Sequence, residues 1–352
     1  MCLEIIGNLW NFLNNTSTPL TSEKIINTVV GFCTPGYSNQ HDILPNAFFA
    51  VANLCAMSKN TRDMLISLNI IYYLDKYLTQ QTCHRQVYSG LRLSFNLLVY
   101  GVDDIWNLIA PLICKIRFHT LNIDLKNRAL AARCLILITK NTEHIKECLK
   151  QNVHSYIFKS ITENINFYCN EIFDLATCFI QAGIFDNFIT LEFVEYCNSF
   201  LDRCDNINDA SSFFVLLTEL IPQINQLLIA QGTIYKIIRV ANNGSFENMK
   251  SATFLLIKFL KTVDSKTSNK IADNGAFEAF CNLVGVTLDP SDLLNILESI
   301  YHFLLTDKDI FLNKAFYLDL ENSLNLCEVE DEICNKQLHL ILSILSQSND
   351  NQ

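Results

Sequence analysis

The chain has 352 residues, of which 50% are apolar, yet it contains only 10 Gly and 6 Pro. A fold of many short strands needs more turn residues than this, so the composition predicts a long, mostly helical protein with a large core. The net charge of −10, from 36 acidic and 26 basic residues, argues against nucleic acid as the main ligand. It is compatible with basic partners and equally with a solvated acidic surface.

The first stretch, MCLEIIGNLWNFL, is apolar but carries Glu4, and it has neither a basic segment before it nor a small-residue cleavage site. We therefore expect a helix here and not a signal peptide. No uninterrupted apolar run in the sequence reaches the length of a membrane-spanning helix, so we expect no membrane partner.

The most apolar helical stretches recur every 40 to 45 residues along the chain. Each can be marked by two residues four positions apart, here called an anchor pair: Glu4/Asn8, Phe49/Asn53, Arg92/Asn96, Arg133/Leu137, Phe173/Thr177, Phe213/Leu217, Thr253/Ile257, Glu298/His302 and Leu338/Leu342. This period is typical of armadillo and HEAT arrays, in which each unit buries its apolar face by stacking on the next. We expect one array over residues 1–346, with about nine units, and a disordered polar tail over 347–352.

A second pattern lies between the anchor pairs: an amphipathic helix, then one Asn or Gly, then a short helix. The central residues are Asn69, Asn152, Gly232 and Gly275. Asn and Gly enter the left-handed conformation at the lowest cost, so each predicts a sharp corner between the first two helices of a three-helix unit. Three helices with such a corner are the armadillo pattern. The predicted fold is an all-α armadillo-repeat solenoid with a right-handed superhelix.

The 14 cysteines include no CxxC motif, which argues against a zinc site or a disulfide framework. Cys55, Cys134, Cys178 and Cys281 lie in apolar stretches, where a reduced thiol packs as a small hydrophobic group. We expect a reducing compartment, either cytoplasm or nucleus. The sequence also lacks a phosphate-binding glycine loop and the GxSxG and HExxH motifs, so we expect no enzymatic activity, cofactor or metal.

Three segments carry a resemblance to a known family: GLRLSFNLLVYGVDDIW, AARCLILITKNTEHIKECLKQNV and ENMKSATFLLIKFLKTVDSKTSNKIADNGAFEAFCNLVGVTLDPSDLLNILESIYHFLL. They resemble the importin-alpha family of armadillo nuclear import adaptors, and the likeness of pattern covers essentially the whole chain. It implies that an extended peptide binds along the third helices, where Asn amides hold its backbone and Trp rings separate its side chains. It also implies residence in cytoplasm and nucleus.

In that family each third helix carries a Trp-x-x-x-Asn pair, which falls on the anchor pairs of this chain. The Asn is present at Asn8, Asn53 and Asn96, but Glu4, Phe49 and Arg92 replace the Trp. The expected groove residues are Asn8, Phe49, Asn53, Arg92, Asn96, Glu298 and His302. Two alternatives stay open: the amides could be surface or capping groups, and Phe49 could be a core aromatic.

Other positions depart from the importin-alpha pattern. Met57 stands where the family has an aspartate that receives a lysine of the bound peptide, and Lys250 stands where the family has an acidic residue before the Trp of a later repeat. The sequence starts inside a helical pattern, so we expect it to lack the basic amino-terminal arm that binds importin-beta in the family.

The leading prediction is a monomeric adaptor that resembles importin-alpha. It would bind extended basic segments of cargo proteins for nuclear import, together with importin-beta-like and export receptors. The alternative is an armadillo scaffold for protein–protein interaction without transport or signal-peptide binding. Nucleic acid is not an expected partner in either case.

Overall fold

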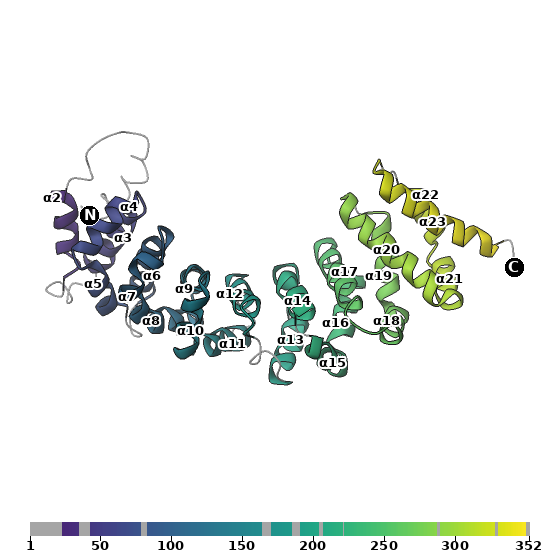
Figure 1. The fold of residues 1–352 in the computed structure, drawn as a ribbon, viewed down its shortest axis with the longest axis horizontal. Helices are drawn as coiled ribbons and strands as arrows, with labels where there is room; N and C mark the ends of the chain where they lie inside the picture. Colours follow the sequence, from purple (N-terminus) through teal and green to yellow (C-terminus); the bar gives the residue numbers. More distant parts are fainter. Residues whose placement is uncertain are drawn as a thin grey trace. The chain divides into compact units, whose positions relative to one another are not determined.

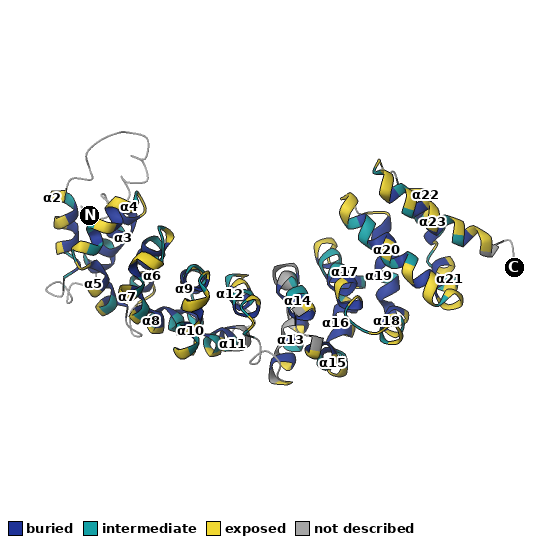
Figure 2. Ribbon diagram, viewed as in Figure 1, coloured by how far each residue is buried: buried dark blue, intermediate teal, exposed yellow. Residues whose placement is uncertain are grey.

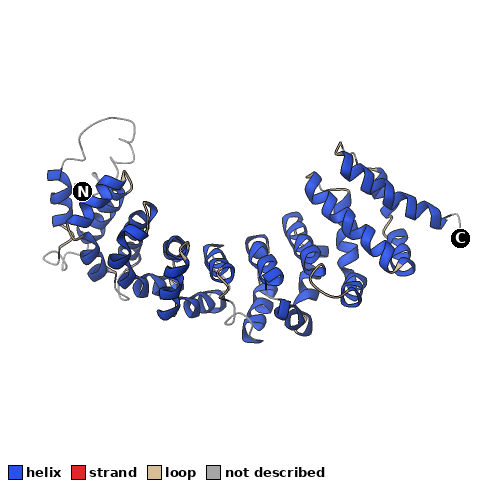
Figure 3. Cartoon of the chain, viewed as in Figure 1, coloured by secondary structure: helices blue, strands red, loops and turns tan. Residues whose placement is uncertain are grey.

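The computed structural model describes residues 23–34, 43–78, 83–163, 170–184, 191–203, 207–220, 222–286, 289–327 and 330–349. All regular elements within these ranges are helical, which confirms the all-α prediction (Figure 3). Contacts divide the chain into two units, Met1–Ile184 and Phe185–Gln352. The single array expected over residues 1–346 stays a prediction.

Within its described residues, the first unit contains a helix pair followed by three repeats of three helices. The pair is α2 (Glu23–Gly31) and α3 (Ile43–Cys55). The repeats are α4 (Lys59–Ser67), α5 (Ile70–Tyr77) and α6 (His84–Val99); α7 (Trp106–Ile109), α8 (Ile113–Phe118) and α9 (Leu125–Thr139); and α10 (Thr142–Lys150), α11 (Val153–Glu163) and α12 (Asn170–Gln181). Short 3₁₀ turns at Asp103–Ile105, Ala110–Leu112 and His119–Leu121 flank α7 and α8.

The second unit follows the same plan in the part that is described. The helix pair is α13 (Leu191–Arg203) and α14 (Asn208–Leu220). The repeats are α15 (Pro222–Ala230), α16 (Thr233–Asn243) and α17 (Phe246–Leu260); α18 (Ser265–Ile271), α19 (Phe277–Val284) and α20 (Pro290–Thr306); and α21 (Lys308–Tyr317), α22 (Leu320–Asn325) and α23 (Glu332–Asn349). Helix α23 continues to Asn349, three residues past the predicted end of the array; residues 350–352 lie outside the described ranges.

Third helices stack side by side within each unit. In the first unit α3 packs on α6, α6 on α9 and α9 on α12; in the second, α14, α17, α20 and α23 pack in the same order (Figure 1). Eight anchor pairs lie on these helices as predicted, while Glu4/Asn8 lies outside the described residues. In both units, buried residues fill the sides on which helices meet (Figure 2).

Helix α6 illustrates how stacking stabilises the fold. Its Leu91, Leu93, Leu97 and Leu98 are each at most 1% exposed. Full burial of one such side chain contributes about 1.5–3 kcal/mol. Because these residues point to different sides of the helix, α6 needs neighbours on both sides, which is why the repeats do not fold singly.

The predicted corners have left-handed backbone conformations. The φ angles are 60° at Asn69, 55° at Asn152, 74° at Gly232 and 118° at Gly275, which confirms all four. A fifth corner, at Asp319 between α21 and α22, has φ 52° and was not predicted. Asp enters this conformation less often than Gly or Asn, so its presence in a sequence is a weaker signal.

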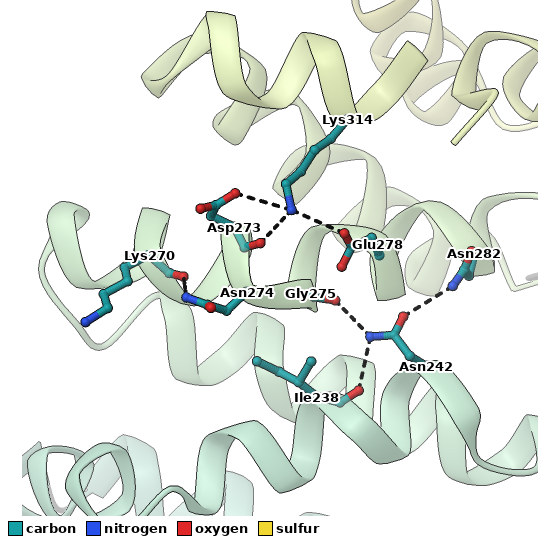
Figure 4. Close-up of polar contacts among 9 residues, drawn as sticks. All are labelled: Ile238, Asn242, Lys270, Asp273, Asn274, Gly275, Glu278, Asn282 and Lys314. Carbon is teal, nitrogen blue, oxygen red and sulfur yellow. Dashed lines mark hydrogen bonds and ion pairs between the residues drawn. The ribbon is translucent and has the colours of Figure 1, made fainter. Parts of the chain in front are cut away.

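The corner at Gly275 allows a close approach of α16. A Cβ atom placed on Gly275 would lie 3.0 Å from both Ile238 Cγ2 and Glu278 Oε2. The amide of Asn242 in α16 donates to the carbonyl of Gly275 at 2.9 Å, and Asn282 in α19 donates to the Asn242 side-chain oxygen at 3.2 Å (Figure 4). Glycine is therefore required here for two reasons, backbone angle and space.

Lysine side chains join successive repeats. Lys314 of α21 donates to the backbone carbonyl of Asp273 at 2.5 Å and lies 3.2 Å from Glu278 Oε1 (Figure 4). In the first unit Lys115 of α8 lies 2.8 Å from Asp75 Oδ1. Each lysine thus reaches the preceding repeat, and these contacts add polar links to the apolar stacking.

The eleven described cysteines are free thiols. Cys55, Cys134 and Cys281 are buried, as their apolar surroundings predict, whereas Cys178 is half-buried. Burial raises the pKa of the Cys55 thiol to about 12. A thiol held protonated in this way is a packing group and a poor nucleophile.

Candidate peptide-binding surface

Phe49 and Arg92, predicted from different repeats, contact each other in the first unit. The guanidinium carbon of Arg92 lies 4.8 Å from the centre of the Phe49 ring, and both side chains are half-buried. Two turns before Arg92, Arg85 of α6 donates to Oδ1 of Asn46, which lies one turn before Phe49 on α3, at 2.8 Å. Helices α3 and α6 therefore present one continuous surface, on which Phe49 packs against an arginine and not deep in the core.

The predicted amides are less exposed than a peptide-binding ladder requires. Asn53 is 4% exposed. Asn96 is half-buried, and its side-chain nitrogen donates to the carbonyl of Ala52 at 2.7 Å. The Asn96 amide thus lies against the backbone of α3 next to position 53, and it is the more accessible of the two amides. Asn8 lies outside the described residues.

Positive charge collects on the exposed sides of α6 and α9. No Asp or Glu occurs in α3, α6 or α9. Five cations on or directly after α6 and α9 form what we name the cationic stripe: Arg85, Arg92, Lys126, Arg133 and Lys140. Arg133 pairs with Glu171 of α12 at 2.6 Å, so the stripe ends where α12 begins. The sequence prediction missed this feature.

A pocket of about 510 Å³ opens at the carboxyl ends of α6 and α9 in the first unit. Leu98, Leu137, Asp103, Lys140 and His144 are among the residues that line it. The His144 ring stacks on Trp106 at 3.7 Å, and its Nε2 lies 3.3 Å from Asp103 Oδ1. The pocket thus has both an apolar floor and groups of both charges.

The second unit has a pocket at a related place, between α17 and α20. It measures about 420 Å³, and Ile257, Glu298 and His302 line it with Lys261 and Ser268. Glu298 and His302 are exposed and lie one turn apart on α20. The structure therefore brings two predicted groove residues together with the anchor residue of the preceding repeat.

Ion pairs link the third helices of the second unit. Lys250 of α17 lies 2.7 Å from Asp292 Oδ2 of α20, and the hydrogen bond to Asp292 raises the lysine pKa. Lys258 of α17 lies 3.2 Å from Glu219 Oε1 of α14. The positive charge of Lys250, which stands at an acidic position of the importin-alpha pattern, is thus balanced by Asp292. Glu298, in contrast, lines the pocket.

Among the described residues, no group of three or more His, Cys, Asp or Glu side chains is arranged to hold a metal ion. No single described helix is long and apolar enough to cross a membrane; two helix pairs, bent by 116° and 117°, reach that length and composition only when both helices are counted together.

Comparison with known proteins identifies the fold. No family model matches the chain, and no curated protein matches it. A structure from work on a phosphorylation switch in the interaction between cadherin and beta-catenin matches with a TM-score of 0.65 and 11% identity, over 99% of this chain and 66% of that one. At this identity the likeness shows the fold alone, and it agrees with an all-α solenoid of armadillo type.

Two artificial proteins are similar at lower scores. An engineered protein matches with a TM-score of 0.49 and 13% identity, over 97% of this chain and 98% of that one. A designed armadillo repeat protein in complex with a (KR)4 peptide matches with a TM-score of 0.41 and 14% identity, over 79% and 99%. Membership of the importin-alpha family stays a prediction.

Proposed function

We propose that the chain is a protein-binding adaptor that holds extended segments of partner proteins along its third helices, and that it is not an enzyme. The observation that carries this proposal is the pocket between α17 and α20, where Ile257, Glu298 and His302 from two successive repeats line one cavity. An extended chain that crosses both helices can place a side chain there, because its side chains alternate between the two faces.

We propose further that basic segments bind in the second unit. The Glu298 carboxylate is exposed at the pocket and can receive a Lys or Arg head group, while Ile257 and Phe303 can contact its aliphatic stem. Residues 185–352 contain 23 Asp and Glu against 11 Lys and Arg, a net charge of −12 that attracts basic segments. If such segments are nuclear localisation signals, the protein is an import adaptor of cytoplasm and nucleus, as the importin-alpha resemblance implies.

A scaffold without transport is the second candidate. It is favoured by exposed apolar residues at the last described repeat: Phe316 is 77%, Tyr317 is 88% and Leu326 is 72% exposed. Phe316 and Tyr317 are adjacent in the sequence, and exposed apolar side chains that lie together are typical of protein contacts. The burial of Asn53 favours the same candidate, because a nearly inaccessible amide is poorly placed to hold a peptide backbone.

Fluorescence anisotropy of a labelled lysine- and arginine-rich peptide, titrated with the whole chain, tests the peptide-binding proposal. We expect Glu298→Lys to weaken binding about tenfold, which is about 1.4 kcal/mol. Asp309→Lys is the matched control. Asp309 is exposed on α21, the first helix of the last described repeat, and this variant changes the net charge by the same amount. Equal weakening by both variants would indicate a general charge effect, and no binding at all would favour the scaffold.

A further inference from the structure

The cationic stripe is regular because it repeats with the fold. Arg85 and Lys126 are 41 residues apart, and so are Arg92 and Arg133, so each pair occupies equivalent places on α6 and α9. Within each helix the two cations are seven residues, or about 10 Å, apart along the axis. Packed helix axes lie about 8–10 Å apart. Four positive charges therefore form a grid, and Lys140 extends it.

Few acidic groups neutralise this grid. Arg92 covers the Phe49 ring and Arg85 donates to the Asn46 amide oxygen, and both of these partners are uncharged. The pair between Arg133 and Glu171 is an ion pair with a neighbouring helix. Because α3, α6 and α9 contain no carboxylate, no acidic group of these three helices lies between the cations of α6 and α9, and α3 beside them is uncharged.

We propose that the cationic stripe is a docking surface for an extended acidic segment of a partner protein. Arginine suits this ligand, because its planar fork matches a carboxylate and forms two parallel hydrogen bonds. Half-buried Tyr88 and half-exposed Val99 lie on the same side of α6 and offer apolar contacts between the acidic positions. The inference rests on the proposed capture of extended segments by third helices, but it concerns the other unit and the opposite charge.

The charge distribution favours an acidic peptide over nucleic acid. Asp174 on α12 and Asp103 after α6 bound the stripe with exposed negative charge. A few cations release few counterions from a polyphosphate, so nucleic acid would be held weakly at physiological salt. A short peptide with separated carboxylates fits between these acidic borders.

The test is fluorescence anisotropy of a labelled twelve-residue peptide rich in Asp and Glu, compared with the same peptide carrying Asn and Gln. We expect the whole chain to bind the acidic peptide at least tenfold more tightly, and raised salt to weaken that binding. Arg92→Glu combined with Arg133→Glu is expected to reduce the affinity at least thirtyfold. If circular dichroism shows that the charge reversal disturbs folding, the milder double variant Arg92→Gln and Arg133→Gln is used in its place. We expect this variant to reduce the affinity about fivefold.

Lys146→Glu with Lys150→Glu is the matched control, because both lysines are exposed on α10 and the charge change is identical. The control is expected to change the affinity less than threefold; an equal loss would overturn the inference. Tighter binding of a single-stranded oligonucleotide than of the acidic peptide would also overturn it. If the basic peptide binds and Glu298→Lys weakens its binding, but the acidic peptide does not bind, the inference about the cationic stripe is wrong and the proposed function stands. If neither peptide binds, the proposed capture of extended segments is wrong as well.

Discussion

The two units of the chain share one plan of helices but carry very different charge. Residues 1–184 contain 15 Lys and Arg against 13 Asp and Glu, a net charge of +2, whereas residues 185–352 contain 11 against 23, a net charge of −12. The stacked third helices bury similar apolar residues in both units. Fold and surface charge are thus set by different residues: the buried positions determine the repeat, and the exposed ones determine what it attracts.

The links between repeats also differ between the units. Arg62 of α4 in the first unit is 1% exposed and donates to the carbonyl of Gly101 at 3.0 Å. Lys314 in the second unit has a side chain that is 23% exposed. A buried polar link is costly to break because it leaves a desolvated group behind, whereas a partly solvated one is replaced by water.

The largest expected effect follows from this contrast. Arg62→Ala should lower the free energy of unfolding of the first unit by about 3–5 kcal/mol, because a large buried side chain and its hydrogen bond to Gly101 are lost. Lys314→Ala should lower the free energy of unfolding of the second unit by about 1 kcal/mol or less. Hydrogen exchange measured peptide by peptide reads each unit separately. Similar losses for both variants would contradict the contrast between buried and exposed links.

The next effect concerns the corners. Gly275→Val should destabilise the second unit by about 2–4 kcal/mol, because valine is strained at φ 118° and its Cβ would meet Ile238. Gly285→Ala is the control, since no atom lies within 4 Å of its added Cβ. We expect faster exchange of the α18 and α19 amides in the first variant alone. An undisturbed α18 in Gly275→Val would show that the corner tolerates a side chain.

Acid should destabilise the first unit through His119, which is 2% exposed. Burial lowers its pKa from 6.5 to about 4. Between these values the unfolded chain binds a proton that the folded chain does not, so stability falls as the pH falls. From pH 7 to pH 5 the loss is about 2 kcal/mol. Urea unfolding of His119→Phe should show a correspondingly smaller loss of unfolding free energy between pH 7 and pH 5. If the variant has the same pH dependence as the unaltered protein, His119 is not the cause of the acid destabilisation.

The smallest expected effect is at the Asn69 corner. Asn69 is left-handed with φ 60° in the first unit, where the second unit has Gly232 at φ 74°. Asn69→Gly removes the side-chain strain but adds freedom to the unfolded chain, so the net change should stay within about 0.5 kcal/mol. Asn69→Val should instead cost about 1–2 kcal/mol. Equal midpoints in urea for the Gly and Val variants would show that this corner does not require the left-handed conformation.

The repeat and most corners could be predicted from the sequence because they depend on local signals. The spacing of apolar residues predicted the third helices, and single Asn or Gly residues predicted four corners. The corner at Asp319 was not predicted, because Asp is also common in ordinary loops and turns. The cross-repeat pairs could not be predicted. Arg92 with Phe49, and Arg133 with Glu171, depend on side-chain directions that only the packed helices define.

The surface charge could be predicted only in part from the sequence. The total of −10 is visible in the sequence, but it conceals a positive first unit and a strongly negative second one. The division becomes readable only when the boundary after Ile184 is known. The predicted preference for basic segments therefore suits the second unit, and the first unit carries an arginine and lysine surface that the whole-chain charge hides.

Hydrogen exchange of the whole chain with each peptide in turn tests the central claim that the units attract opposite charges. The account predicts that the acidic peptide slows exchange in α6 and α9 and leaves α17 and α20 unchanged. The basic peptide should protect α17 and α20 and leave α6 and α9 unchanged. Protection of the same helices by both peptides would contradict the account.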